Sequence, residues 1–358
     1  MRLALLLLLC ACSAAPESQR PSCRIPLARE LGSELHLAPI GATQLLLVCH
    51  GGEPFDSGDW LWVVDLEHES VEQRQCQPPC GTRGFGASLC VSSDGRRVLV
   101  GANSGTQARE PGSVLVFRWP QLELEFEVRG DQGGDWFGSS IAELADQDGD
   151  AQPDYVVGAP RSNSGALVLF SGADGRILRR IEGPEFGLAL SNCADCDGDG
   201  VPDLAVYGVG VVELRSGRDL HVLRTLKTHG GMWPVLIGGA GLALLEDDGG
   251  SWLYSSHLTV TAWSSGQFKQ VCQWKPDRYA HLYPCPGDPT GARLVHPQGN
   301  QLVSSDVSGK DELELGPLEN STPRAACGLP SSSTTRWRTA VVLAQSGGRG
   351  SELLLTTR

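Results

Sequence analysis

Long amphipathic runs of the kind that form helices are scarce in this chain of 358 residues. Glycine (45 residues) and proline (22 residues) are frequent instead, and both residues mark turns. Such a composition argues against a helical fold and favours many short strands joined by turns. We therefore predict an all-β fold, and at this length one domain and two domains are both open.

Positive charge is also in short supply. The chain has 29 Lys and Arg residues against 42 Asp and Glu residues, which gives a formal net charge of -13 at pH 7. This surplus of negative charge repels phosphate backbones and anionic lipid headgroups. We therefore expect no nucleic-acid partner, and no attraction between the folded chain and a membrane surface.

The common catalytic signatures are missing from the sequence. We find no His-Glu-x-x-His, no Gly-x-Ser-x-Gly, no phosphate-binding Gly-x-x-x-x-Gly-Lys and no dinucleotide fingerprint. The eight histidines form no pair at i, i+2 or i, i+4 spacing. These absences favour a protein that is not an enzyme.

An apolar run long enough to span a bilayer is missing as well. The N-terminus has the layout of a secretory signal, with Arg2, a short apolar run from Leu3 to Leu9 and then small residues. We therefore assign residues 1–22 to a signal peptide with a polar spacer. The folded domain is expected over residues 23–358.

Within this signal, the stretch Leu9-Cys10-Ala11-Cys12 resembles the bacterial lipobox, whose cysteine is lipidated and becomes the mature N-terminus. Cys12 is the predicted lipidation site, and the predicted location is the bacterial cell envelope, with the lipid as the only membrane contact. Ordinary cleavage after Ala15 followed by secretion is the alternative.

Ten of the 12 cysteines lie beyond the signal, and an even number in an exported chain is typical of disulfides. Cys76 and Cys80, and likewise Cys193 and Cys196, are close enough in sequence to bridge locally. A zinc site shared by both pairs and a redox function for Cys193 and Cys196 are weaker alternatives.

Short apolar triplets recur along the chain, and each is followed after a turn by a second apolar strand. The triplets begin at Leu46, Val98, Tyr155, Leu204, Trp252, Gln301 and Val341. A unit of about fifty residues matches one four-stranded antiparallel sheet, which buries both faces only by stacking on its neighbours. Radial closure of these units predicts a seven-bladed β-propeller.

The last unit leaves no residues for an outermost strand. The segment RIPLARELGSELHLAPI, which begins at Arg24, precedes the first triplet and is available to complete the seventh blade. Cys23 and Cys327 are then expected near the seam, where a bridge between them would lock the ring. A solenoid and two separate sandwiches are the alternative architectures.

Two loops carry carboxylates at the same spacing, DQDGDAQPD and, one unit later, DCDGDGVPD. Carboxylates at positions 1, 3, 5 and 9 and a backbone carbonyl at position 7 surround a hard cation with oxygens. The candidate ligands of the first loop are Asp146, Asp148, Asp150, Gln152 and Asp154. Those of the second loop are Asp195, Asp197, Asp199, Val201 and Asp203.

These loops differ from EF-hands, which need a glutamate at position 12 and flanking helices. Val157 and Val206 occupy that position inside apolar strands. Four crowded carboxylates without a counter-ion are electrostatically costly, which favours two bound cations, calcium in particular, over the alternative of plain polar turns.

The segment from Phe137 to Gly172 resembles the FG-GAP repeat of the integrin α propeller and of many exported bacterial proteins. It opens with Phe137-Gly138, holds the acidic loop and ends with Val157-Gly158-Ala159-Pro160. Phe186 to Gly217 shows the same pattern except for its ending. Phe85 to Trp119 keeps Phe85-Gly86 but has a shortened loop with too few ligands for a metal.

The resemblance implies a seven-bladed propeller with structural calcium in loops between the first two strands of selected blades, and ligand binding by loops on the other face. Ala151 stands where the family often has a glycine, so the first loop is expected to bind calcium more weakly than the second, which has Gly200.

These patterns predict a non-catalytic calcium-binding propeller at the cell envelope that binds a protein or a glycan, or acts as a scaffold. An extracellular propeller enzyme that cleaves glycans with a pair of carboxylates is the alternative. The tripeptide Arg129-Gly130-Asp131 matches the one that integrins recognise, but we interpret it as part of a turn leading to Phe137.

Overall fold

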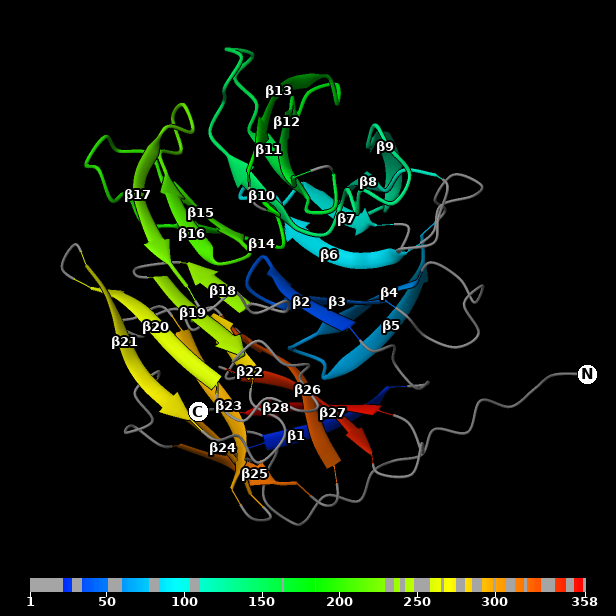
Figure 1. The fold of residues 1–358 in the computed structure, drawn as a ribbon. Coiled ribbons are helices and arrows are strands. Elements are labelled where there is room, and N and C mark those ends of the chain that lie inside the picture. The colour runs from blue at the N-terminus through cyan, green and yellow to red at the C-terminus, as the bar shows by residue number, and fades with distance from the viewer. Residues whose placement is uncertain are drawn as a thin grey trace, which may run out of the picture.

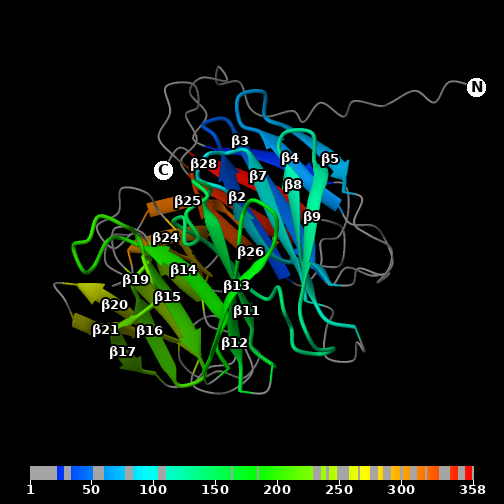
Figure 2. The ribbon, with the colours of Figure 1, turned by 90° about the horizontal axis from the view of Figure 1, so that it is seen from above.

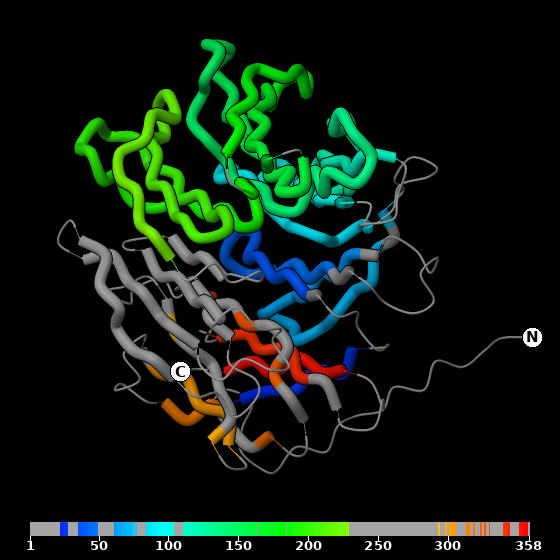
Figure 3. Tube along the Cα trace, viewed as in Figure 1, coloured from blue at the N-terminus to red at the C-terminus, as the bar shows by residue number. Residues whose placement is uncertain are grey.

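A computed structural model describes the chain in segments separated by gaps. The described residues are 22–27, 34–50, 60–76, 84–103, 110–162, 164–183, 185–228, 235–238, 242–247, 258–264, 267–274, 281–284, 292–298, 301–306, 313–318, 321–329, 339–345 and 351–356. Cys12, Ala15 and Cys80 lie outside the described residues, and so does the triplet at Trp252. Figure 3 shows how the described segments run through the molecule.

The described residues form 28 strands in seven four-stranded antiparallel sheets, which confirms the predicted all-β fold. The first sheet contains β2 (Glu34–Ile40), β3 (Gln44–His50), β4 (Trp60–Asp65) and β5 (Ser70–Gln75). The second sheet contains β6 (Phe85–Val91), β7 (Arg97–Ala102), β8 (Ser113–Arg118) and β9 (Glu123–Arg129). The third sheet contains β10 (Ile141–Leu144), β11 (Asp154–Ala159), β12 (Ala166–Phe170) and β13 (Ile177–Glu182).

The remaining sheets follow the same order. The fourth sheet contains β14 (Ala189–Cys193), β15 (Asp203–Gly208), β16 (Val211–Arg215) and β17 (Val222–Lys227). The fifth sheet contains β18 (Val235–Gly238), β19 (Leu242–Asp247), β20 (Leu258–Ser264) and β21 (Gln267–Trp274). The sixth sheet contains β22 (His281–Pro284), β23 (Ala292–Gln298), β24 (Gln301–Asp306) and β25 (Leu313–Pro317). The seventh sheet contains β26 (Ser321–Gly328), β27 (Thr339–Gln345), β28 (Ser351–Thr356) and β1 (Ser22–Leu27).

The first strand of each sheet, or β26 in the seventh, lies on the inside of the arrangement (Figure 1), which Figure 2 shows from above. Contacts between these inner strands run from β2 to β6, β10, β14, β18, β22 and β26 in turn, and β26 contacts β2 again. Only residues 24–27 of the predicted N-terminal segment belong to the seventh sheet, in β1, which pairs antiparallel with β28 as the outermost strand; residues 34–40 form β2 of the first sheet instead. The first and last described strands therefore share one sheet, as the sequence predicts.

The hydrophobic core lies between neighbouring sheets. The central strands β7 and β11 are almost continuously apolar and buried, because each of their faces meets another sheet. Alternate residues point to opposite faces, so that Val98 and Val100 pack toward the first sheet and Leu99 toward the third. The outer strands β13 and β17 carry charged and exposed residues, which fits their place at the rim.

Glycines set the spacing between the second, third and fourth sheets. A Cβ on Gly158 would lie 2.1 Å from the carbonyl oxygen of Gly187 in the next sheet, and a Cβ on Gly101 would lie 2.0 Å from that of Gly138. The same carbonyl of Gly187 accepts a hydrogen bond of 2.7 Å from the hydroxyl of Ser140. The Phe-Gly start of one repeat therefore packs on the Val-Gly-Ala end of the preceding one.

Two of the triplets bear on the strand order. In the fifth sheet the second strand is β19, Leu242–Asp247, which pairs with both β18 and β20, and the triplet at Trp252 lies outside the described residues. The triplet at Gln301 begins the third strand of its sheet, and β23 precedes it as the second. Apolar content alone does not say which of two adjacent strands comes first.

The expected bridge between Cys23 and Cys327 is also contradicted. Cys23 pairs with Leu355, Leu355 with Ala340, and Ala340 with Cys327, so the two cysteines lie in one row of the seventh sheet, three strands apart. Three strand spacings amount to about 14 Å, whereas a disulfide requires Cα atoms roughly 4.4–6.8 Å apart.

In the part of the chain that the structure describes, no helix has the length and hydrophobicity that crossing a membrane requires.

Candidate metal sites

The two acidic loops join the first and second strands of neighbouring sheets. The third-sheet loop (residues 145–153) connects β10 to β11, and the fourth-sheet loop (residues 194–202) connects β14 to β15. In each sheet the last carboxylate of the motif begins the second strand: Asp154 pairs with Leu144, and Asp203 pairs with Cys193. Strand pairing therefore fixes both ends of each loop.

Asp154 and Asp203 are fully buried and hold the loops to the rest of their sheets. Asp154 accepts hydrogen bonds from the backbone amides of Gly172 (3.0 Å) and Gln147 (2.6 Å). Asp203 accepts the equivalent bonds from Gly217 (3.1 Å) and Cys196 (2.7 Å).

Burial raises the pKa of both Asp154 and Asp203, and these backbone hydrogen bonds oppose the rise only in part. The other carboxylates of the same loops raise the two pKa values further, because their negative charges repel an ionised Asp154 or Asp203. A cation at this place would remove both penalties.

Asp146 and Asp195, the first carboxylates of the motifs, shape the loop backbone. Asp146 accepts hydrogen bonds from the amides of Ala151 (2.8 Å) and Gly149 (2.6 Å). Asp195 accepts them from Gly200 (2.8 Å) and Gly198 (2.6 Å). These backbone bonds lower the pKa of both carboxyls, so both are ionised at neutral pH.

Three carboxylates converge at each loop. The ligand atoms of the first group, Asp146, Asp148 and Asp154, lie within 4.8 Å of one another, and the same holds for Asp195, Asp197 and Asp203. Negative charges at such distances repel one another strongly unless a cation lies between them. An all-oxygen set of this kind suits a hard divalent cation such as calcium, so the residues fit the metal that the sequence predicts.

The structure leaves two predicted ligands outside these groups. Asp150 accepts hydrogen bonds from the amide of Gln152 (2.7 Å) and the hydroxyl of Ser171 (3.3 Å). Asp199 accepts them from the amide of Val201 (2.8 Å) and the guanidinium of Arg218 (2.6 Å). Gln152 and Val201 are the residues whose backbone carbonyls the sequence predicts as ligands. In the structure their backbone amides donate hydrogen bonds to Asp150 and Asp199, the carboxylates at the fifth position of each loop.

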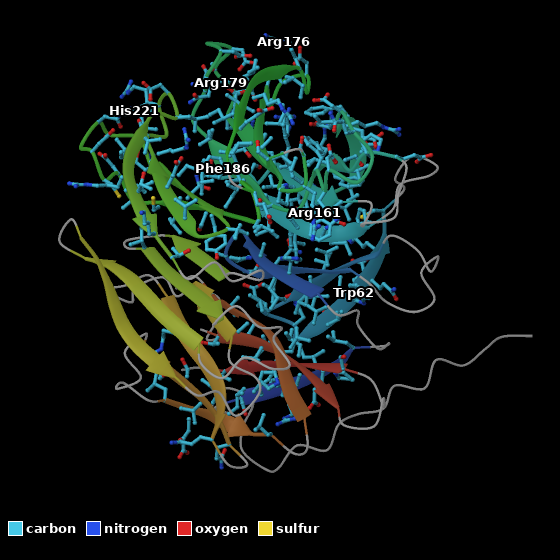
Figure 4. The ribbon with its side chains drawn as sticks, viewed as in Figure 1. Trp62, Arg161, Arg176, Arg179, Phe186 and His221 are labelled. Atoms are coloured by element: carbon cyan, nitrogen blue, oxygen red, sulfur yellow. The ribbon has the colours of Figure 1, made fainter. Side chains whose placement is uncertain are left out.

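Two arginines that the sequence does not predict as part of these sites contact the acidic loops. Arg176 donates to Asp148 at 2.8 Å, and Arg218 donates to Asp199, whose pKa this contact lowers. Both arginines come from the turn between the third and fourth strands of their sheets, and Arg176 lies at the outer tip of the third sheet (Figure 4). Their positions, four residues after Gly172 and one after Gly217, give no shared sequence signal.

The loops also differ in backbone strain at their sixth position. Ala151 has a φ of +66° and Gly200 a φ of +86°, so both take the left-handed conformation. Glycine adopts this conformation freely, whereas alanine does so at a cost. The prediction that Ala151 stands where a glycine is preferred agrees with this geometry.

The second sheet uses an arginine where the next two sheets use a buried aspartate. Arg97 begins β7 as Asp154 begins β11. Its guanidinium binds Glu125 (2.7 Å) and the carbonyl oxygen of Gly172 in the third sheet (2.8 Å). The shortened loop in front of it is closed by the hydroxyl of Ser92, which bonds to Asp94 and to the backbone carbonyl of Arg97.

The fourth-sheet loop carries two thiols. Cys193 is buried at the end of β14, and Cys196 is exposed in the loop. Burial raises the pKa of both thiols.

The tripeptide at residues 129–131 begins at the last residue of β9 and runs into the turn between the second and third sheets, and its charged side chains are paired. Arg129 binds Glu127 at 3.1 Å, and Asp131 accepts a hydrogen bond of 3.3 Å from Arg180. These ion pairs fit the interpretation of the tripeptide as part of a turn.

No family model matches the chain. Part of it is similar to integrin α chains: human integrin alpha-D is 37% identical over 102 residues, human integrin alpha-X 38% over 104 residues and integrin alpha-4 of Xenopus laevis 34% over 117 residues. These matches cover 25%, 25% and 28% of this chain and only 9%, 9% and 11% of the respective relatives. The chain therefore spans about a tenth of the length of these curated relatives.

Solved structures resemble nearly the whole chain. The Neurospora crassa Pan2 WD40 domain has a TM-score of 0.62 at 10% identity and covers 92% of this chain and 90% of its own. The Cps50 (Swd1) beta-propeller domain of Myceliophteria thermophila has a TM-score of 0.58 at 12% identity, with coverage of 93% and 98%. Kuenenia stuttgartiensis hydrazine synthase has a TM-score of 0.59 at 14% identity, with coverage of 93% and 97%. At such identities the likeness shows the fold alone, a β-propeller.

Proposed function

We propose that this chain is a non-catalytic, calcium-stabilised propeller of seven blades that binds a protein or a glycan, or acts as a scaffold, outside the cell. The observation that carries the proposal is the pair of three-carboxylate groups, built alike in two neighbouring sheets. The cyclic contacts of the inner strands, from β2 round to β26 and back to β2, support the closed ring.

The location and the partner class rest on sequence and similarity. The partial likeness to integrin α chains supports an adhesion or scaffold role, and the secretory layout of residues 1–22 supports export. Lipid attachment at Cys12 belongs to the same proposal. The cation role is architectural, because the buried carboxylate of each group also holds the backbone of a turn in its own sheet.

A calorimetric calcium titration of the purified chain tests the cation role. We expect two sites in the parent, one in each of the single variants Asp148→Ala and Asp197→Ala, and none in the double variant. Affinities in the range of about 10⁻⁴ to 10⁻³ M would match extracellular calcium modules. A parent that binds no calcium would refute the proposed metal role and leave the loops as polar turns.

A mass measurement of the purified mature chain tests the anchor. A lipidated N-terminus at Cys12 is expected, whereas an unmodified chain that begins at Pro16 would show ordinary cleavage after Ala15 and rule out the lipid. Removal of Cys12 by substitution with alanine should release the chain from membranes into the soluble fraction.

A further inference from the structure

The fourth-sheet loop has two cysteines at positions where the third-sheet loop has none. Cys193 pairs with Asp203 as Leu144 pairs with Asp154. Cys196 donates its backbone amide to the buried carboxylate of Asp203, as Gln147 does to Asp154. The two loops are therefore matched in backbone geometry, and the thiol pair is what distinguishes them.

The backbone brings the two cysteines to neighbouring positions at the start of the loop. The side chain of Cys193 is buried at the end of β14, and that of Cys196 is exposed. Asp203 links the two residues, because it pairs with Cys193 and accepts the amide hydrogen bond of Cys196. The Cys196 sulfur also donates to the backbone carbonyl of Ala194 at 3.1 Å. Two cysteines that the backbone holds this close can reach the geometry of a disulfide by a local adjustment of the loop.

We propose that Cys193 and Cys196 form a reversible disulfide that rigidifies the fourth-sheet loop and raises its affinity for a divalent cation. Formation of the bridge is independent of any metal, whereas the gain in affinity rests on the proposed function. The third-sheet loop, which has Leu144 and Gln147 at these positions, is insensitive to thiol oxidation.

The oxidant in this proposal is another disulfide, of a small thiol or of a thiol–disulfide exchange protein. Cys196, the exposed thiol, loses its proton to solvent and attacks that disulfide, which gives a mixed disulfide and releases one thiol. Cys193 then attacks the Cys196 sulfur, which forms the Cys193–Cys196 bond and releases the second thiol. Two electrons and two protons pass from the cysteine pair to the external disulfide.

The bridge would act on the loop through its first ligand. Asp195 lies between the two cysteines and accepts amide hydrogen bonds from Gly198 and Gly200 across the turn. A covalent link from the end of β14 to Cys196 reduces the number of loop conformations in the metal-free protein. Less ordering is then left to occur when the cation binds, so affinity rises.

Peptide mapping tests the bridge. The purified chain is equilibrated with an excess of oxidised or reduced glutathione, alkylated and digested with trypsin, which releases the peptide 181–215 with both cysteines and no others. The expected product after oxidation is lighter than the unalkylated dithiol peptide by two hydrogen masses. Two alkylated cysteines, two glutathione adducts or a link to another cysteine would overturn the proposal.

Calcium titrations test the effect on affinity. In the Asp148→Ala background, where only the fourth-sheet loop binds, oxidation should tighten calcium binding about tenfold. In the Asp197→Ala background, where only the third-sheet loop binds, the two redox states should agree. The double substitution Cys193→Leu and Cys196→Gln gives the fourth-sheet loop the residues of the third-sheet loop. It should keep calcium binding at this loop but abolish the change of affinity on oxidation. A change of affinity that persists in this variant would refute the role of the cysteine pair.

Hydrogen exchange separates failure of this inference from failure of the proposed metal role. Without any calcium, the amides of Gly198 and Gly200 should exchange more slowly in the oxidised chain than in the reduced chain. If neither loop binds calcium but this difference is present, the bridge and its rigidifying effect stand and only the metal role fails. Equal exchange in the two redox states would overturn the rigidifying effect whatever the metal result.

Discussion

The side-chain amide of Gln147 in the third sheet donates to the backbone carbonyl of Gly217 in the fourth sheet at 2.9 Å. Gly217 in turn donates its own amide to the buried carboxylate of Asp203. The arrangement is repeated one sheet earlier, where Arg97 donates to the carbonyl of Gly172, whose amide binds Asp154. Each acidic loop is thus joined to the preceding sheet through one glycine of its own sheet, so order in the loop supports the contact between sheets.

Calcium should therefore stabilise the whole fold rather than the loops alone. We expect calcium to raise the thermal unfolding temperature of the parent chain. The variant Asp154→Ala should lose most of the part of this increase that comes from calcium binding at the third-sheet loop. Differential scanning calorimetry with calcium and with a chelator measures this. The matched control is Asp174→Ala, an acidic residue of the same sheet that lies outside the metal group. An equal loss in both variants would contradict the specific role of Asp154.

The residues at the sixth position of the two loops, Ala151 and Gly200, can each be replaced by the residue of the other loop. Ala151→Gly should relieve the left-handed strain and increase calcium affinity of the third-sheet loop, while Gly200→Ala should decrease that of the fourth. No atom lies within 4 Å of a Cβ at Gly200, so the effect is conformational rather than steric. A change of about 1 kcal/mol in each direction is expected from the cost of the left-handed region. Titration of each loop alone measures it, and changes of the same sign in both loops would refute the explanation.

The arginine contacts predict unequal effects of two alanine substitutions. Arg176 neutralises Asp148, a member of the metal group, so its guanidinium competes with the cation for the same oxygen. Arg176→Ala should raise the calcium affinity of the third-sheet loop about threefold, a modest factor because the arginine is largely solvent-exposed. Arg218 binds Asp199, which lies outside the group, so Arg218→Ala should change the affinity less. Calorimetry on both variants decides, and a fall in affinity for Arg176→Ala would show that the arginine orders the loop instead.

Much of this organisation can be predicted from the sequence, and the failures have physical causes. The acidic spacing and the Phe-Gly positions predict the two loops, because the residues that shape each loop are adjacent in the chain. The contacts of Arg97 and Arg176 are not predictable in this way, since their partners come from another sheet or another turn. The order of β23 and β24 is not predictable for a related reason: each strand holds one short apolar run, Leu294-Val295 or Leu302-Val303, and only pairing with β22 shows which strand is second.

The raised pKa values of Asp154 and Asp203 predict how calcium stabilisation depends on pH. In the metal-free protein each of these carboxyls contributes stability below the ordinary pKa of 3.8, and that contribution is lost as the pH rises through the higher pKa of the folded state. Calcium binds the ionised forms, so it restores stability where the metal-free protein has lost it. The increase in unfolding temperature on adding calcium should be large at pH 7 and shrink as the pH falls toward 3.8. An increase that does not vary over this range would contradict the role of the two buried carboxyls.

The spacing between sheets depends on Gly158, which explains the Val-Gly-Ala end of the repeat. An alanine Cβ there would lie 2.1 Å from the carbonyl oxygen and 2.6 Å from the Cα of Gly187, both backbone atoms that cannot move without shifting the fourth sheet. Gly158→Ala should therefore destabilise the fold by about 3 kcal/mol, as overpacking in a tight interior does. Gly149→Ala is the matched control, since Gly149 has a φ of +86° but open space around it, and conformational strain alone costs about 1 kcal/mol. Chemical denaturation of the two variants separates the causes. If both lose the same stability, backbone conformation rather than the contact with Gly187 explains the glycine at position 158.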